Sequence, residues 1–329
     1  MGKRACIFIE HRGGEVKNVV FEIAGRLGAL GCDICGLVLA ADEGSGTLVA
    51  QKAAGVMAEV FVLVDEAFAS YDSLVWGSRA ADFIGRLAGE GGEISIVAAG
   101  STPLGKDLLA GASARLGRGF GSDCLGLDMA DDGSVTILRP FYGGKVRGRV
   151  LMQGPGPHFV TVRPNTFRPA QPGDQSAAIS VRKLEPAPDA PKTAVIESRA
   201  APAAKVDIAE ADIVVCGGRG IKEKDNFHIV EKLADAAGGV AGASRAVVDA
   251  GWRDLSEQVG KSGKTISASL YIGVGVSGAI HHRMGMDACR HIVVINSDEG
   301  AEFFKYADIG VVGDLNEVVP ALIEELRRM

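Results

Sequence analysis

Apolar positions in residues 1–165 fall into two alternating patterns. Short apolar runs predict strands, and longer stretches with apolar residues at helical spacing predict helices. The expected strands are Ala5–Ile9, Gly36–Leu39, Val60–Val64 and Ile94–Ala98. The expected helices are Asn18–Leu30 and Leu74–Ala88, the second with Asp72 as its N-cap. Strands that alternate with helices are typical of a parallel α/β sheet.

Three further short strands follow with no helix between them. They are Ser134–Arg139, Lys145–Met152 and His158–Arg163, joined by glycine-rich segments. Because strands joined by short turns pair as hairpins, we expect hairpins that are added to the first sheet.

The segment 183–205 separates this pattern from a second one. Seven of the twelve prolines fall between Pro164 and Pro202, and residues 183–205 are rich in proline and alanine with weak periodicity. Such a composition is typical of an extended linker. We therefore expect an N-terminal α/β domain over residues 1–182 and a C-terminal domain over residues 206–329.

The α/β pattern restarts after the linker. A strand at Ile213–Cys216 leads through the glycine-rich turn 217–220 into a helix, and we place Gly242–Arg245 at the next turn. The last expected strand, Ile309–Val312, leads into a short terminal helix. Pro320 is expected in the first turn of that helix, where no backbone N–H is required.

A strand, a glycine-rich turn, a helix and a second strand follow one another late in the chain. The strands are Tyr271–Val276 and His291–Asn296, and Ser277-Gly278 is expected to open the helix. Free backbone N–H groups and the helix dipole make such a turn an anion site, most often for phosphate. Phosphate binding does not require the adjacent His281 and His282, which therefore indicate a second chemical task.

Polar residues follow the carboxyl end of each major strand in this domain. They are Arg219, Ser244, Arg245, Ser277, Asn296 and Asp314. Open parallel sheets bind ligands along that edge, so this pattern predicts a doubly wound, Rossmann-like domain with a large phosphate-containing ligand such as a dinucleotide. The standard G-x-G-x-x-G fingerprint of NAD-binding domains, with an acid about twenty residues on, is absent.

Composition narrows the class of protein. The chain has 329 residues, 47% of them apolar, but no apolar run approaches the length of a membrane span. Its first residues show no signal or transit pattern, so we expect a cytoplasmic protein without membrane insertion. Six cysteines include a single C-x-x-C, Cys32 to Cys35, which we interpret as packing residues and not as a metal site.

The net charge of −6 lies entirely in the second domain. Residues 206–329 hold 13 basic and 19 acidic side chains, whereas residues 1–205 hold 22 of each. This distribution argues against a nucleic-acid partner. A bound phosphate must then be held by local groups.

Several motifs resemble the alpha subunit of electron-transfer flavoproteins. They are GGRGIK, GASRAVVDAGW, QVGKSGK, LYIGVGVSGAIHH and the closing ADIGVVGDL in residues 217–315, and STPLGKDLL at 101–109. The resemblance implies a heterodimer with a beta subunit, and one FAD held mainly by the second domain of alpha. It implies no metal.

The resemblance also implies the residues that contact FAD. They are Arg219, Ser244, Arg245, Val259, Gly260, Lys261, Ser262, Ser277, Gly278, Ala279, Ile280, His281, His282, Asn296, Asp314 and Leu315. Arg219 and Ser244 would hold the phosphate and ribose region, and 277–280 would cradle the pyrophosphate. Asn296 and Asp314-Leu315 would lie along the ADP portion.

Arg245, Ser262 and His282 would face the flavin ring. Reduction of the flavin by one electron places negative charge on the ring, and a guanidinium that does not deprotonate stabilises it. A histidine donor would add to this effect, and a hydroxyl would adjust the proton on the ring. Successive helical positions point about 100° apart, so we expect His281 to face solvent or an interface.

The chain departs from the family pattern at three places. His281 stands where glutamine is usual, Lys261-Ser262 where Gln-Thr is usual, and Ala301-Glu302 where Ala-Pro is usual. Serine keeps the hydroxyl but loses the methyl group that fixes χ1. These departures leave the redox potentials open.

Three functions remain to be weighed. The first is an electron carrier that transforms no substrate, reduced by dehydrogenases such as those of acyl-CoA and oxidised by an acceptor such as a quinone reductase. The second is the alpha subunit of an NADH-dependent, flavin-based electron-bifurcating complex with a second FAD on beta. The third is a nucleotide-binding module without redox work, against which Arg245, Ser262 and His282 speak.

Overall fold

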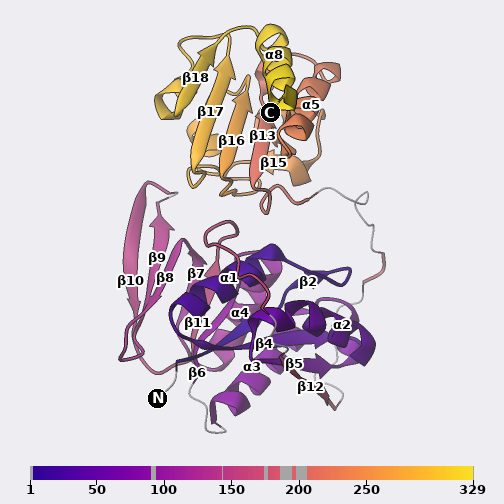
Figure 1. The fold of residues 1–329 in the computed structure, drawn as a ribbon, viewed down its shortest axis with the longest axis vertical. Helices are drawn as coiled ribbons and strands as arrows, with labels where there is room; N and C mark the ends of the chain where they lie inside the picture. Colours follow the sequence, from indigo (N-terminus) through magenta and orange to yellow (C-terminus); the bar gives the residue numbers. More distant parts are fainter. Residues whose placement is uncertain are drawn as a thin grey trace. The chain divides into compact units, whose positions relative to one another are not determined.

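The chain forms two compact units in a computed structural model, Met1–Arg199 and Ala200–Met329. The structure describes residues 3–89, 94–142, 144–173, 177–185, 195–197 and 206–328, and Figure 1 shows its elements. Most of the expected linker 183–205 lies outside the described residues. Each unit is described by itself.

The N-terminal unit is built on seven parallel strands. Their order is β12 (Ala178–Lys183), β5 (Glu59–Val64), β4 (Asp33–Ala40), β1 (Arg4–Phe8), β6 (Ile94–Gly100), β11 (His158–Val162) and β7 (Phe120–Cys124). Helices α1 (Asn18–Ala29) and α2 (Glu43–Ala53) pack on one face, and α3 (Ser73–Gly89) and α4 (Pro103–Arg115) on the other. The four expected strands and both expected helices are confirmed, and Asp72 Oδ1 accepts a hydrogen bond from Leu74 N at 3.0 Å.

The expectation for the three later strands was partly wrong. β9 (Val135–Phe141) and β10 (Val146–Met152) do pair as a hairpin, but with β8 (Gly126–Met129) they form a separate sheet. β11 is no hairpin strand, because it lies between β6 and β7 as a parallel strand of the main sheet. All five of its residues are buried, which is typical of a strand inside a parallel sheet.

The C-terminal unit is a six-stranded parallel sheet. Its order is β15 (Gln258–Val259), β14 (Val240–Ser244), β13 (Ile213–Gly217), β16 (Leu270–Val274), β17 (His291–Asn296) and β18 (Ile309–Val312). Numbered along the chain, this is the order 3-2-1-4-5-6 of doubly wound dinucleotide-binding domains. The two-domain α/β fold class is therefore confirmed. The order reverses between β13 and β16, which places the ligand crevice at their carboxyl ends.

Different elements cover the two faces of this sheet. Helices α5 (His228–Ala236), α6 (Arg245–Asp249) and α8 (Leu315–Arg328) cover one face, and Figure 1 shows α5 beside α8. Loops, the short helix α7 (Ile280–Arg283) and the 3-10 helix η6 (Glu302–Tyr306) cover the other, with Phe303 and Met286 buried there. This second face is therefore covered mainly by loops.

The remaining elements are short. They are β2 (His11–Arg12) and β3 (Glu15–Val16), which form a hairpin, and the 3-10 helices η1 (Ala54–Val56), η2 (Glu66–Ala69), η3 (Arg219–Ile221), η4 (Asp225–Phe227) and η5 (Leu255–Glu257). Within the described residues, every helix falls short of the length and apolarity needed to cross a membrane.

Three local expectations in the second domain were wrong. Gly242–Ser244 belong to β14 and not to a turn, and α7 begins at Ile280 instead of Ser277. Pro320 is the sixth residue of α8, beyond its first turn. Both Pro320 and Asn316, whose carbonyl would otherwise accept from position 320, are exposed. The missing hydrogen bond therefore lies on the exposed side of the helix, where a carbonyl group is not cut off from solvent.

Candidate cofactor-binding site

A cavity of about 540 Å³ opens at the carboxyl edge of the second sheet, within the size range of ligand pockets. Several residues expected to contact a cofactor line it: Arg219, Ser244, Arg245, Val259, Gly260, Ser262, Ser277, Ala279, His281, His282 and Asn296. Lys261 and Gly278 belong to the loops of this wall, and Ile280 is the first residue of α7, whereas Asp314 and Leu315 follow the edge strand β18. These five residues are not part of the cavity wall.

Glycines let the turns after β13 and β16 touch backbone to backbone. A Cβ added to Gly218 would lie 2.1 Å from the carbonyl oxygen of Gly275, and one added to Gly220 would lie 2.8 Å from Gly275 Cα. The Gly218 amide donates to Val274 O at 2.8 Å, and the Gly220 amide to Gly275 O at 3.0 Å. These glycines therefore shape the crevice, but their amides already donate hydrogen bonds within the protein and are not free to bind a ligand.

The segment 277–281, a loop that leads into the first two residues of α7, carries the amides that remain available. Within the part of the chain that the structure describes, the N–H groups of Ser277, Gly278, Ala279, Ile280 and His281 donate no hydrogen bond. Because α7 has four residues, its dipole contributes little, and an anion bound here would be held by the free amides themselves. The prediction that a helix begins at Ser277 is therefore wrong, because the helix begins at Ile280.

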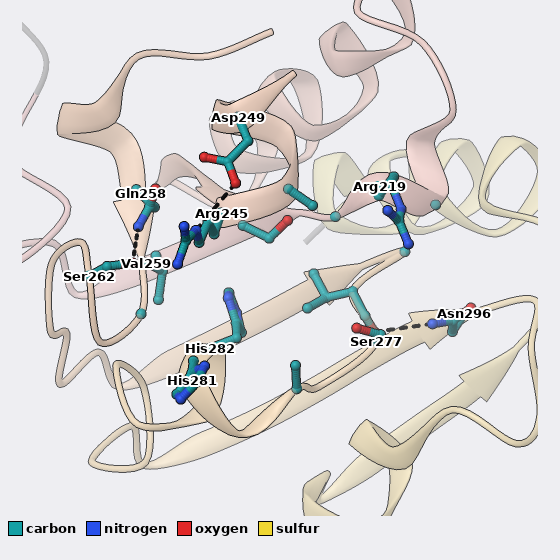
Figure 2. Close-up of a pocket in the computed structure, with 18 of the residues that line it drawn as sticks. Arg219, Arg245, Asp249, Gln258, Val259, Ser262, Ser277, His281, His282 and Asn296 are labelled. Carbon is teal, nitrogen blue, oxygen red and sulfur yellow. Dashed lines mark hydrogen bonds and ion pairs between the residues drawn. The ribbon is translucent and has the colours of Figure 1, made fainter. Parts of the chain in front are cut away.

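Polar side chains gather at the two ends of the cavity. Figure 2 shows Arg219, Ser277 and Asn296 at one end and Arg245 and His282 at the other. Arg245 is the first residue of α6, and its Nε lies 3.2 Å from Asp249 Oδ2 in a largely exposed ion pair. One end of the cavity thus suits an anion, and the other holds a permanent cation.

His282 is buried, whereas its neighbour His281 is exposed. The His282 Nε2 atom lies 2.7 Å from Tyr271 Oη, and Nδ1 is buried without a hydrogen-bond partner among the described residues. Burial lowers the pKa of His282 to about 4. The Val259 backbone acts in the opposite direction and raises the pKa of His282, but it makes no hydrogen bond to Nδ1. His282 is therefore neutral near pH 7 and retains one unsatisfied ring nitrogen.

The sequence has close relatives throughout its length. A model of the electron transfer flavoprotein domain matches residues 5–218, and one of the electron transfer flavoprotein FAD-binding domain matches residues 207–287. The electron transfer flavoprotein subunit alpha of Thermoanaerobacterium thermosaccharolyticum is 37% identical over 99% of this chain and 98% of its own. That of Bacillus subtilis is 36% identical over 100% of this chain and 99% of its own.

The chain belongs to the electron transfer flavoprotein alpha-subunit family. FAD is therefore the cofactor of its C-terminal domain. The cavity fits this cofactor, because free amides suit a pyrophosphate, and a cation and an unsatisfied buried nitrogen suit a ring that becomes negatively charged.

The loop before α7 is held in place from behind. Arg283 Nε donates to Gly278 O at 3.0 Å, and its guanidinium lies 3.6 Å from the centre of the Tyr306 ring. Glu302 lies 3.8 Å from Arg283 as an ion pair. The departure at Glu302, where the family usually has proline, thus supplies a counter-charge to the residue that holds the loop. The departure at His281 is an exposed side chain on the rim of the cavity.

Asn296 and Asp314 both act within the protein. Asn296 Nδ2 donates to Val276 O at 3.1 Å, which ties the end of β17 to the turn after β16. Asp314 Oδ1 accepts from Asn316 N at 2.8 Å at the start of α8, and this hydrogen bond lowers the pKa of the carboxyl. Both residues have a structural task whether or not they contact FAD.

The loop with Ser262 is fixed to the helix with His282. Lys261 N donates to His281 O at 2.7 Å, and a Cβ on Gly285 would lie 2.4 Å from the backbone of Gly260. Gln258 Nε2 donates to Ser262 Oγ at 3.0 Å. With its oxygen accepting from Gln258, the Ser262 hydroxyl is left with a proton to donate.

Sequence reasoning missed several residues of the cavity wall and one behind it. The wall also includes Gly218, Gly220, Ala246, Asp249, Gln258, Gly275, Val276 and Asp298. Asp249 was detectable, because it stands four residues after Arg245 at the spacing of a helical ion pair. Gln258 belongs to the QVGKSGK motif, but nothing in the sequence marks its contact with Ser262. Tyr271 reads as an ordinary apolar strand residue.

Proposed function

We propose that this chain is the FAD-carrying alpha subunit of a heterodimeric electron carrier. It would take single electrons from flavin dehydrogenases, such as those of acyl-CoA, and pass them to an acceptor such as a quinone reductase. The observation that carries this proposal is the division of one cavity between free amides at the nucleotide end and Arg245 with His282 at the other end. The curated relatives are named as alpha subunits, which supports a beta partner.

The residues of the cavity would divide the work as follows. The amides of 277–281 hold the pyrophosphate, and Arg219 and Ser244 hold the adjoining phosphate and ribose region. Asn296 and the pair Asp314-Leu315 lie along the ADP portion.

At the other end of the cavity, Arg245 supplies positive charge, His282 a ring nitrogen and Ser262 a hydroxyl. When bound, the flavin supplies the redox chemistry, in which it gains negative charge on reduction. A fixed cation and neutral donors favour that charge without a proton transfer.

The test is to co-express the chain with the beta subunit and measure FAD per heterodimer. We expect a yellow complex whose absorbance bleaches with an acyl-CoA dehydrogenase and its substrate, and recovers with a quinone acceptor. One FAD per heterodimer supports a simple carrier. A second FAD together with NADH oxidation would replace it by the bifurcating complex, and a colourless complex would contradict both.

A further inference from the structure

Three buried polar groups form a chain behind the cavity. Tyr271 Oη lies 2.7 Å from His282 Nε2, and Cys216 Sγ lies 4.0 Å from the same nitrogen. Tyr271 and Cys216 are fully buried on the neighbouring strands β16 and β13. The thiol of Cys216 also interacts with the Tyr271 hydroxyl. Each buried polar group of this kind needs a hydrogen-bond partner, so the donor and the acceptor of every contact have to be identified.

All three groups are neutral near pH 7. Burial raises the pKa of Cys216 to about 12 and raises the pKa of Tyr271 well above its ordinary value. Burial lowers the pKa of His282 to about 4. The neutral imidazole therefore carries one proton, and its place on Nδ1 or Nε2 depends on the neighbours.

Packing restricts the orientation of the imidazole. The Phe303 ring lies 6.0 Å from the His282 ring in an edge-on arrangement and 5.8 Å from the Tyr271 ring. Phe303 is fully buried. This packing keeps Nε2 against the tyrosine, so that Nδ1 is the nitrogen left for another partner.

Two proton arrangements are conceivable along this chain. In the first, the Tyr271 hydroxyl donates to Nε2, and His282 carries its proton on Nδ1. In the second, Nε2–H donates to Tyr271 Oη and the hydroxyl donates to sulfur. Sulfur is a weak acceptor, whereas an imidazole nitrogen is a good one, so the first arrangement makes better hydrogen bonds.

Val259, whose backbone raises the pKa of His282 against the effect of burial, lines the cavity. Nδ1 has no hydrogen-bond partner among the described residues. A proton on Nδ1 would therefore be free to be donated to a ligand in the cavity.

We infer that Tyr271 is a positioning residue, whose hydroxyl donates to His282 Nε2 and fixes the neutral imidazole as the Nδ1–H tautomer. His282 then offers a donor, and not a lone pair, to the ligand of the cavity. The inference rests on the proposed function for the identity of that ligand as the flavin of FAD. Its first part, the tautomer, stands without FAD.

The test of the tautomer uses the full-length chain with ¹⁵N-labelled histidine. Long-range ¹H–¹⁵N spectra distinguish a protonated from an unprotonated ring nitrogen, and His282→Asn identifies the signal. We expect a protonated Nδ1 and an unprotonated Nε2 in the unmodified chain. A protonated Nε2 would overturn the inference, and this measurement needs no variant at Tyr271.

The role of the hydroxyl is tested with Tyr271→Phe, which keeps the ring against Phe303. We expect the Nδ1–H signature to be lost or mixed, because Nε2 loses its donor. Tyr306→Phe is the matched control, since Tyr306 is partly exposed and stacks on Arg283. An unchanged tautomer in Tyr271→Phe would exclude the assigned role.

The consequence for the ligand is measured on the complex with the beta subunit. Loss of one hydrogen bond predicts that Tyr271→Phe raises the FAD dissociation constant by about 2- to 10-fold and lowers the reduction potential of bound FAD. If the unmodified complex binds no FAD, the proposed function fails while the tautomer result stands. If FAD binds the variant unchanged at the same potential, the step from tautomer to ligand fails while the proposed function stands.

Discussion

Arg245 carries a permanent positive charge, and Asp249 determines how much of that charge reaches the cavity. The two side chains are 67% and 63% exposed and lie 3.2 Å apart, one helical turn from each other. An exposed pair of this kind contributes little to stability. The pair instead affects the electrostatic potential at the mouth of the cavity. Arg245 makes this potential more positive, and Asp249 partly cancels that effect.

We predict opposite effects for the two members of this pair. Arg245→Ala should lower the reduction potential of bound FAD by roughly 40–90 mV, which corresponds to about 1–2 kcal/mol for one electron. Screening by solvent favours the lower end of that range. Asp249→Asn should raise the potential, because it removes the counter-charge. Redox titration of both variants in the complex checks this, and shifts of equal sign would contradict it.

His282 is the residue whose titration should be visible in stability. Its pKa of about 4 lies below the ordinary value of 6.5, because burial disfavours the charged ring. Between these values the unfolded chain binds a proton that the folded site excludes, so stability falls as pH decreases from about 6.5 to about 4. At about 1.4 kcal/mol per pKa unit, this site contributes roughly 2–4 kcal/mol to that loss.

We therefore predict a smaller acid-induced loss of stability in His282→Asn than in the unmodified chain. Urea unfolding at several pH values across this window gives the comparison. His281→Asn is the matched control, because it changes the same residue type on the exposed side of α7. Identical pH profiles for His282→Asn and the unmodified chain would show that the folded protein does not suppress protonation of the imidazole.

At the scale of elements, the crevice depends on contacts between turns. The turns after β13 and β16 touch at Gly218, Gly220 and Gly275, and the loop of Ser262 is held to α7 through Gly260 and Gly285. None of these contacts leaves room for a side chain. The geometry of both ends of the cavity is therefore set by backbone contacts, and these contacts fix the positions of the polar side chains.

Gly218→Ala tests this dependence. The added methyl group would lie 2.1 Å from Gly275 O, so the two turns must separate. We expect destabilisation by about 1–3 kcal/mol and a marked loss of FAD, because the cavity wall moves. Gly111→Ala is the control, since Gly111 lies inside α4 with nothing within 4 Å of the added carbon. That variant should be stabilised by about 0.5–1 kcal/mol.

The elements that the sequence predicted well are those with a clear period. The strands β1, β4, β5 and β6 appeared as apolar runs between helical patterns, and the structure confirms each of them. β11 was misjudged, because an apolar run after a hairpin does not reveal which sheet it joins. The start of α7 was misjudged too, because glycine and serine precede loops as readily as helices.

Within the site, the sequence indicated positions but not partners. The motif resemblance predicted that Arg245, Ser262 and His282 lie together, and the structure brings all three to one cavity. Their partners depend on how loops pack across strands. Tyr271 and His282 stand eleven residues apart in strand and helix, and no spacing rule connects their side chains.

At the scale of the whole molecule, each unit has its own hydrophobic core. Among the described residues of the N-terminal unit, two buried clusters lie one on each face of the seven-stranded sheet. Two further clusters lie on the faces of the six-stranded sheet, around Phe227 and Val230 on one side and Tyr271 and Phe303 on the other. A core on both faces is what a segment needs to fold alone.

We predict that residues 206–329, expressed alone, fold and contain the main determinants of FAD binding. All residues of the cavity wall lie in this segment, from Gly218 to Asp298, as do both clusters of its core. Retention should be weaker than in the complex, because we expect the beta subunit to complete the surroundings of the flavin. Circular dichroism checks folding, and flavin absorbance after gel filtration checks binding. Residues 1–205 are the matched control, and FAD bound equally well by that segment would show that the cofactor has been assigned to the wrong domain.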